Sequence, residues 1–378
     1  PGFDEPWSIY KAEELFKNVA DKNHPTETVL TIIQSKGTLP REQAGRNIHY
    51  DDASLANYKK VEQGDFIIHL RSFEGGLEMA NEDGIVSPAY TILRCKKPHS
   101  SLFYEAYFHT DEFINHILSK SVEGIRDGRQ ISYEAFKWLG LPYCDVSEQK
   151  KIAQLFCSLG HRIEKQQQMV DALKKYKRGL LNQIFSAISK GSQRRKLREL
   201  VHVSGGKTPS MSNSLYWNGD IVWISSKDMK SSRISGSELK ITNLALNEMT
   251  LYHPGTLLLV ARSGILKHSL PLAILEVDAT INQDIKALQV HGCNAFYLYY
   301  AILSQEDTII RTLVKTGTTV QSLMMDSFLN IEIPTPDIDQ QQRIIDKLAK
   351  LEKYVEVQEK ELSLLSQMRN GLLQQLFI

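Results

Sequence analysis

The sequence contains 378 residues, 42% of them hydrophobic, which is typical of a soluble globular protein with two or three domains. Lysine and arginine (45) nearly balance aspartate and glutamate (44), and the net charge of +1 gives no overall indication of a nucleic-acid partner. No apolar run approaches the roughly 18 residues of a membrane span, and no signal peptide opens the sequence, so we expect a cytoplasmic protein without a membrane partner. The sequence begins at Pro1, which leaves open whether residues precede it.

The cysteines and histidines do not suggest a metal site. Cys95, Cys144, Cys157 and Cys293 form no Cys-x-x-Cys pair, and no His-Glu-x-x-His motif occurs. We therefore expect no metal, no disulfide framework, and cysteines that are reduced and mostly buried.

The first 140 residues are predicted to form a globular domain of mixed α and β structure. Strands are expected at 28–33, 65–70 and 89–93, and a helix at 111–119. This segment carries a net charge of −5.

A long helix is expected next, over approximately 146–186. Asp145 and Ser147 are candidate N-caps, and about 40 residues without proline follow. A helix of this length extends about 60 Å and requires a partner helix to be stable. The basic stretch from Lys190 to Arg198, with Arg194, Arg195 and Lys196, joins this helix to the second half; a solvated linker and a DNA-backbone contact are both open.

The second globular segment, residues 190–332, is also predicted to be mixed. Strands are expected at 221–224, 256–260 and 284–289, and a helix at 295–304. A second long helix is expected over approximately 338–377, with Asp337 and Asp339 as candidate N-caps.

An internal repeat relates the two helical segments. Residues 141–185 and 333–377 align without a gap at an offset of 192, with thirteen identities that include Gln149/Gln341 and Phe185/Phe377. Apolar residues recur at steps of four and three in both copies, from Ile152 and from Ile344, which predicts an antiparallel helix pair within the chain. The halves should then be related by an approximate two-fold axis.

Gln166 and Gln358 occupy equivalent positions in the two apolar seams. Near the middle of an antiparallel pair, equivalent residues face each other, so we expect these amides to fix the register of the helices. The alternative is that each glutamine simply points to solvent.

Catalytic motifs are not convincing. Ser204–Thr208 resembles a phosphate-binding loop superficially, but such a loop needs a glycine five residues before the lysine, where His202 stands. No dinucleotide-binding turn and no Asn-Pro-Pro-aromatic motif of adenine methyltransferases occurs, and no cofactor is expected in this chain.

The sequence resembles the specificity subunits of type I restriction-modification systems over nearly its whole length. In the second half the resemblance depends on Gly205–Pro209, Asn282–Asp284 and Gly317–Val320, and in the helical repeats on Glu148–Lys150 and the two Gly-Leu-Leu runs. In the first half it depends on Pro1–Trp7, on Asn57–Phe66 and on Val86–Tyr90, which are weaker signatures. Gln340 and Cys144 depart from the usual Glu and Pro.

The resemblance implies an α+β architecture. Two target-recognition domains, 1–140 and 190–332, would alternate with two helical regions, 141–189 and 333–378, that pair as an antiparallel, pseudo-two-fold-symmetric coiled coil. It also implies a non-catalytic subunit that reads double-stranded DNA, each domain reading one half of a split target. The expected partners are two methylation subunits, which carry S-adenosylmethionine, and two restriction subunits, which use ATP and Mg²⁺.

Candidate DNA-contacting residues are polar side chains near loops, because arginine suits guanine and glutamine suits adenine in the major groove. An ordinary surface role is the alternative for each. In the first domain these residues are Arg71, Ser72, Arg126, Arg129 and Gln130. In the second they are Lys207, Thr208, Ser226, Lys227, Arg262, Ser263, Lys315, Thr318 and Gln321.

Two other functions are left open. The chain could be the specificity portion of a fused or related methyltransferase, although the missing methyltransferase motifs argue against catalysis. It could also be a coiled-coil adaptor that does not read DNA.

Overall fold

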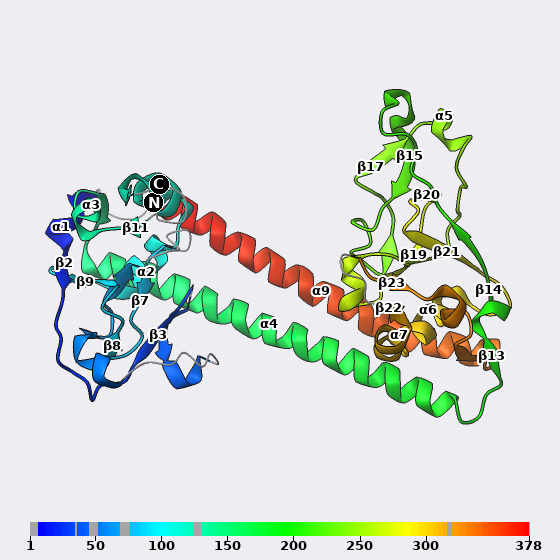
Figure 1. Cartoon of the computed structure of the whole chain (residues 1–378), viewed down its shortest axis with the longest axis horizontal. Helices are drawn as coiled ribbons and strands as arrows, with labels where there is room; N and C mark the ends of the chain where they lie inside the picture. The colour runs from blue at the N-terminus through cyan, green and yellow to red at the C-terminus, as the bar shows by residue number, and fades with distance from the viewer. Residues whose placement is uncertain are drawn as a thin grey trace. The chain divides into compact units, whose positions relative to one another are not determined.

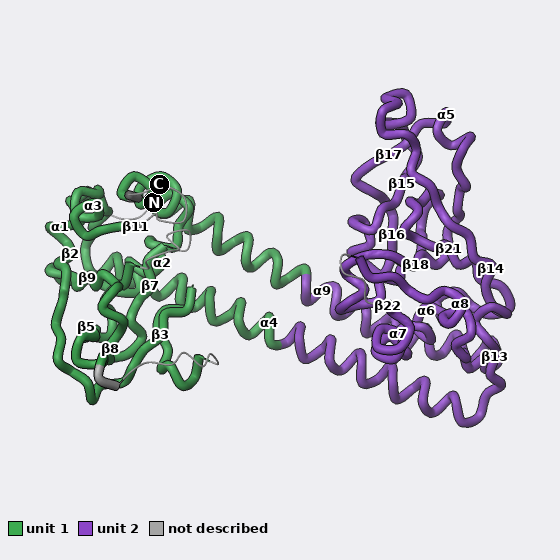
Figure 2. The backbone as a smooth tube through the Cα atoms, in the orientation of Figure 1, with its two compact units in different colours: residues 1–168, 360–378 green, residues 169–359 purple. Residues whose placement is uncertain are grey.

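The computed structural model of the chain describes residues 7–34, 36–44, 52–68, 76–123, 130–315 and 320–377. It divides into two compact units, residues 1–168 with 360–378 and residues 169–359 (Figure 2). Each unit contains a globular head and part of two long helices, α4 (Val146–Ile188) and α9 (Ile338–Phe377). The predicted helix bounds are therefore confirmed almost to the residue.

The head of unit 1 is built on a four-stranded antiparallel sheet with the order β2-β9-β6-β7. Three further antiparallel pairs, β1-β12, β3-β4 and β5-β8, surround it, and β10 pairs with β11. Its elements are β1 (Ser8–Lys11), α1 (Ala12–Leu15), β2 (Phe16–Val19), β3 (Leu30–Ile33), β4 (Gly37–Pro40), β5 (Lys59–Val61), β6 (Phe66–Ile68), β7 (Glu78–Met79), β8 (Gly84–Val86), β9 (Thr91–Cys95), α2 (Ser101–Phe108), β10 (Val122–Glu123), β11 (Gln130–Ile131), α3 (Tyr133–Phe136) and β12 (Gly140–Tyr143).

The head of unit 2 contains a five-stranded sheet with the order β14-β21-β18-β19-β16 and a three-stranded sheet with the order β17-β15-β20. Its elements are β13 (Arg194–Lys196), β14 (Val201–Gly205), β15 (Trp217–Ile224), β16 (Arg233–Ile234), β17 (Leu239–Ile241), α5 (Asn243–Leu246), β18 (Leu257–Val260), β19 (Leu272–Leu275), β20 (Ala279–Ile281), β21 (Ile285–Val290), α6 (Ala295–Leu303), α7 (Glu306–Leu313), β22 (Val314–Lys315), β23 (Ser322–Leu323), α8 (Met325–Phe328) and β24 (Glu332–Pro334).

The long helices begin at acidic caps and run antiparallel within each unit (Figure 1). Asp145 Oδ1 accepts a hydrogen bond from Ser147 N, and Asp337 Oδ1 accepts one from Gln340 N, so Asp145 and Asp337 are the N-caps. In unit 1 the Phe156 ring lies 6.3 Å from the Phe377 ring, and Arg162 pairs with Glu361. In unit 2 Lys174 pairs with Glu359, and Lys177 with Glu352. Residue numbers fall on α9 as they rise on α4, which confirms the predicted antiparallel direction.

Each hydrophobic core includes residues from both long helices. In unit 1, Phe156 of α4 and Phe377 of α9 pack among the aromatic side chains of α2. In unit 2, Phe185 of α4 and Leu348 of α9 pack with α6. Burial of this apolar surface holds each head on its helices.

Both heads are attached to the helices by the same contacts. Gln149 Nε2 donates to the Cys144 carbonyl and Gln149 Oε1 accepts from Ser100 N, both at 2.9 Å. Gln341 makes the equivalent bonds, to the Pro336 carbonyl and from Asn294 N, also at 2.9 Å. The strand pair β1-β12 likewise has a counterpart in β13-β24. The internal repeat therefore extends from the helices into the junctions with the heads.

Three expectations need correction. The basic stretch after α4 is not a free linker, because Arg194–Lys196 form strand β13, Arg194 pairs with Glu332 and Arg195 with Glu199. The segment expected to be an α-helix at 111–119 is a π-helical turn, Glu112–Ile117, followed by a 3₁₀ turn. All four cysteines are free as expected, but only Cys144 is buried and Cys157 is exposed, because Cys157 lies off the apolar seam of α4.

Candidate nucleic-acid interface

Three loops of unit 2 meet where β15, β18 and β20 end. Strands β15 and β20 are parallel, with Ile224 opposite Ile281, so the chain leaves both at the same edge of the sheet. Asn282 N donates to the Ile224 carbonyl at 2.9 Å, and Ala261 N donates to the Asp284 carbonyl at 2.8 Å. These bonds bring together the segments 225–228, 261–263 and 282–284.

The glycine-rich segment before Pro209 packs directly on these loops. A Cβ atom at Gly206 would lie 2.0 Å from the Ile281 carbonyl oxygen, so only glycine permits this approach. Lys207 N donates to the same carbonyl at 3.0 Å, and Thr208 Oγ1 donates to Gln283 Oε1 at 2.5 Å. The two sequence motifs of the second half, Gly205–Pro209 and Asn282–Asp284, are therefore one structural feature.

Strand β23 and the residue before it lie beside these loops. Arg262 forms a bridge with Ser322, Ser263 N donates to the Gln321 carbonyl at 3.0 Å, and Lys315 lies opposite Ser322 in the β22-β23 pair. We call the segments 206–208, 225–228, 261–263, 282–284 and 321–322 the loop cluster.

A tight turn presents Ser226 and Lys227. Asp228 Oδ2 accepts hydrogen bonds from Ser225 N (2.8 Å) and Ser225 Oγ (2.7 Å), and its Oδ1 accepts one from Glu238 N (2.9 Å). Burial opposes ionisation of Asp228, but these bonds outweigh it and lower its pKa. The aspartate is thus occupied by the turn, which leaves Lys227 exposed beside it.

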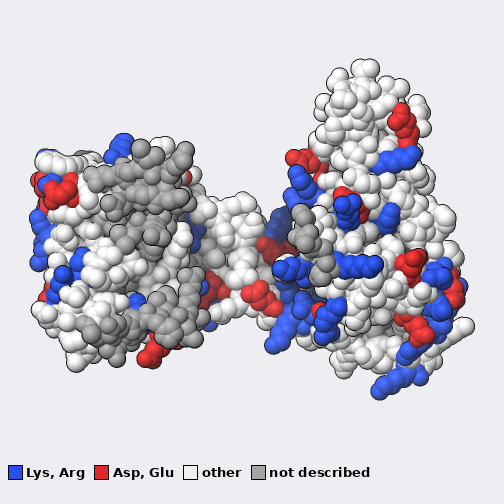
Figure 3. All heavy atoms as spheres, viewed as in Figure 1, with Lys and Arg blue, Asp and Glu red and all other residues white. Residues whose placement is uncertain are grey.

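The cations of the loop cluster are available for a negatively charged partner. Lys207, Lys227 and Arg262 are exposed, and none of the ion pairs found among the described residues includes them. Lysine and arginine side chains also gather on the viewed face of unit 2, whereas the end that carries α5 shows few charges (Figure 3). Unpaired cations on loops beside hydroxyl and amide side chains suit contacts with phosphates and base edges.

The structure brings most of the candidates in the second domain together. Lys207, Thr208, Ser226, Lys227, Arg262, Ser263, Lys315 and Gln321 lie on or beside the loop cluster, and Thr318 lies outside the described residues. Gln283 was not among the candidates, although the Asn282–Asp284 motif was a signal for it.

The candidates of the first domain are not placed. Arg71, Ser72, Arg126 and Arg129 lie outside the described residues, and Gln130 is described only through its backbone pairing with Glu123. Gln166 and Gln358 are half-buried on α4 and α9 but belong to different units, so their facing each other stays a prediction.

The described part of the chain shows no feature of a metal site or a membrane anchor. It contains no cluster of three or more His, Cys, Asp or Glu residues arranged to hold a metal ion. Along the same residues, no helix combines the length and the apolar character that a membrane crossing requires.

A cationic loop cluster on a head of mixed α and β structure suits a protein that binds nucleic acid. Residues 189–367 match the family described as the type I restriction modification DNA specificity domain. The chain is 38% identical over 160 residues to the specificity subunit of the Escherichia coli type I restriction enzyme EcoR124I/EcoR124II, which covers 41% of this chain and 40% of that protein. It is 30% identical over 190 residues to the MjaIX specificity subunit of Methanocaldococcus jannaschii, which covers 49% of this chain and 43% of that protein. The chain thus aligns with less than half the length of these relatives.

The fold has a counterpart among solved structures. The type I restriction-modification S subunit from M. genitalium superposes with a TM-score of 0.62 at 14% identity, over 99% of this chain and 97% of that one. Residues 189–367 thus match the DNA specificity domain of type I restriction-modification systems, and the fold of the whole chain is similar to that of a solved S subunit.

Proposed function

We propose that this chain is the non-catalytic, sequence-reading subunit of a cytoplasmic type I restriction-modification complex. Each head reads one half of a bipartite double-stranded DNA target, and α4 and α9 set the spacing between the halves. In this proposal the heads are residues 1–140 and 190–332, and the helical regions are residues 141–189 and 333–378.

The observation that carries this proposal is the loop cluster of unit 2. Its exposed cations, Lys207, Lys227 and Arg262, lie among hydroxyl and amide side chains, and no ion pair within the described part of the chain includes them. Cations contribute affinity through the phosphates, whereas Arg262, Gln283 and Gln321 can discriminate base edges.

The partners are those that the family resemblance implies, and the near-neutral charge of the chain suggests that they help to bind the DNA. With a net charge of +1, the isolated subunit neutralises few phosphates and should bind DNA weakly. Two methylation subunits, docked on the helical regions, would complete the DNA-binding surface and supply S-adenosylmethionine. Two restriction subunits would supply ATP- and Mg²⁺-dependent cleavage.

A domain exchange tests the proposal. Residues 1–140 are replaced by the corresponding domain of another specificity subunit, and methylated adenines are mapped by sequencing in cells that also carry the methylation subunits. We expect one half of the target to change while the other half and the spacing persist. A change in both halves would contradict independent reading, and loss of all methylation from a folded chimera would contradict modularity.

The same assay addresses the alternatives. Methylation by the purified chain alone would indicate a fused methyltransferase. An assembled complex with no sequence-specific footprint would indicate a structural adaptor.

A further inference from the structure

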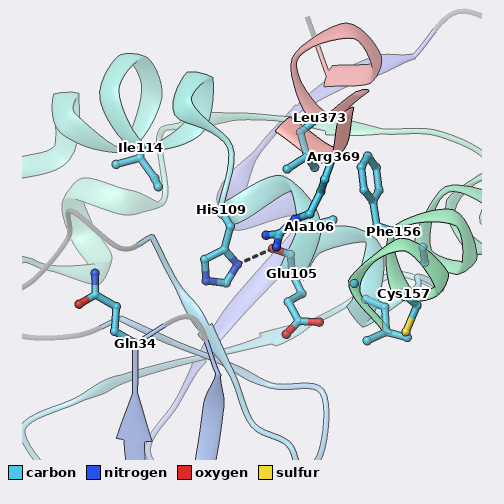
Figure 4. A pocket seen from close by; sticks show the side chains of 12 residues that line it. Gln34, Glu105, Ala106, His109, Ile114, Phe156, Cys157, Arg369 and Leu373 are labelled. Carbon is cyan, nitrogen blue, oxygen red and sulfur yellow. Dashed lines mark hydrogen bonds between the residues drawn. The ribbon is translucent and has the colours of Figure 1, made fainter. Parts of the chain in front are cut away.

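Unit 1 contains a cavity of about 330 Å³ where α2 meets α4 and α9. It is lined by Glu105 and Ala106 of α2, His109 directly after α2, Phe156 of α4 and Arg369 of α9 (Figure 4). Gly160 of α4 also lines it. This volume is at the lower end of the range of roughly 300–1,000 Å³ that small-molecule sites occupy.

In unit 2, three interacting side chains occupy the equivalent position. Tyr300 Oη donates to Glu352 Oε2 at 2.9 Å, and Lys177 Nζ pairs with the same carboxylate. Glu352 is only 8% exposed and Tyr300 only 1%. A buried carboxylate of this kind is tolerated because it is both hydrogen-bonded and ion-paired.

The internal repeat shows which residues replace these three in unit 1. The offset of 192 puts Gly160 at the position of Glu352 and Arg369 at that of Lys177. The N-caps Ser100 and Asn294, which make the same bond to Gln149 and Gln341, put Ala106 at the position of Tyr300.

The cavity is therefore the space of a missing phenol ring and a missing carboxylate. A Cβ atom added at Gly160 would meet no atom within 4 Å. The cation that would pair with the carboxylate is retained as Arg369, and no ion pair within 4.0 Å among the described residues includes it.

His109 and Glu105 line the same cavity as Arg369. His109 Nδ1 donates to the Glu105 carbonyl at 2.8 Å, and its Nε2 lies 3.5 Å from Glu78 Oε1. Burial raises the pKa of Glu105, whereas the charges of His109 and Arg369 lower it, and no ion pair within 4.0 Å among the described residues joins Glu105 to Arg369. Phe156, Ile114 and Leu373 provide apolar surface for a ring.

We propose that this cavity binds a small aromatic carboxylate, whose ring takes the place that Tyr300 fills in unit 2 and whose carboxylate pairs with Arg369. This ligand site would be a function separate from DNA recognition. It can be tested even if the proposed function fails, because ligand binding is measured on the chain without DNA.

The probe is 3-(4-hydroxyphenyl)propionate, and 4-ethylphenol serves as the analogue without a carboxylate. Binding to the full chain is measured by saturation-transfer NMR and calorimetry. We expect the carboxylate to bind at least about tenfold more tightly than the phenol, because Arg369 contributes a charge-assisted hydrogen bond. Arg369→Gln should remove this preference.

The decisive variant rebuilds the arrangement of unit 2 inside unit 1. Gly160→Glu together with Ala106→Tyr should fill the cavity and abolish binding of the probe. Replacing a helical glycine raises helix propensity, so the variant should fold. Gly179→Glu is the matched control, because Gly179 is a helical glycine whose Cβ would also meet no atom within 4 Å; it should bind the probe as the wild type does.

Two results would overturn the proposal. One is equal, weak or absent binding of both probes to the wild-type chain. The other is unchanged binding of the carboxylate by the folded Gly160→Glu/Ala106→Tyr variant.

Discussion

At the scale of single residues, Arg262 is the side chain of the loop cluster best suited to read a base. It is exposed at the end of β18, and its backbone is held by the bridge to Ser322. A guanidinium can bond two acceptors of guanine in a fixed plane, whereas a lysine in its place would keep the charge and lose this geometry.

Arg262→Lys should therefore lower discrimination at one base pair by about 1–3 kcal/mol while the salt dependence of binding stays the same. The measurement is competition binding by the reconstituted complex on targets altered one position at a time. Lys240→Ala, at an exposed residue of β17, should change neither quantity. Unaltered discrimination at every position in Arg262→Lys would show that Arg262 does not read a base.

Asp228 stabilises the turn that presents Lys227, and its effect should depend on pH. Its pKa in the folded protein lies below the ordinary value of 3.8, so its contribution is present above that value and is lost as the pH falls. Asp228→Asn should destabilise unit 2 by roughly 1–2 kcal/mol at pH 7, and the difference from the wild type should shrink below about pH 4. Urea unfolding at pH 7, 4 and 3 measures this, and a difference that does not vary with pH would be inconsistent with the ionised form being the stabilising one.

At the scale of elements, Gln149 and Gln341 connect the start of each long helix to the N-cap of a helix in the head, Ser100 for α2 and Asn294 for α6. Both amides are buried, Gln149 completely and Gln341 to 4% exposure. Each satisfies one part-buried backbone donor and one buried backbone acceptor.

Gln149→Ala should cost about 2–3 kcal/mol of unfolding free energy because it leaves the Ser100 N–H and the Cys144 carbonyl without partners. Gln341→Ala should cost a similar amount. The control is Gln154→Ala, at an exposed position of the same helix as Gln149, which should change stability by no more than about 0.5 kcal/mol. Equal effects at positions 149 and 154 in chemical denaturation would show that the buried amide adds nothing.

At the scale of the whole molecule, Gln166 and Gln358 are predicted to set the register of α4 and α9. Both are half-buried, so neither points fully to solvent. A polar residue in an apolar seam lowers stability and selects one register.

Replacing both glutamines with leucine should raise the thermal unfolding temperature and loosen the spacing between half-sites. Thermal unfolding and methylated-adenine sequencing measure the two effects. Gln154→Leu, outside the seam, should leave the spacing unchanged. A double variant that loses stability and retains a single spacing would rule out the register role.

The sequence alone determined the features that depend on local periodicity and on internal similarity. The two long helices follow from apolar residues that recur at steps of four and three along about 40 residues without proline, and six predicted strands lie at β3, β6, β9, β15, β18 and β21. Helix α2 was missed because Ser101–Phe108 is largely apolar on all sides and shows little helical periodicity. The repeat and the motifs were sufficient to indicate the family.

Only the tertiary structure decided how distant segments meet. The loop cluster joins residues about 115 positions apart along the chain, and it depends on a parallel strand pair and on the close approach of Gly206, neither of which has a local signature. The same holds for the cavity of unit 1, which exists because Ala106 and Gly160 are small where Tyr300 and Glu352 are large. Side-chain volume at a junction acts only between elements that the fold has already brought together, so a pattern read along one segment cannot reveal it.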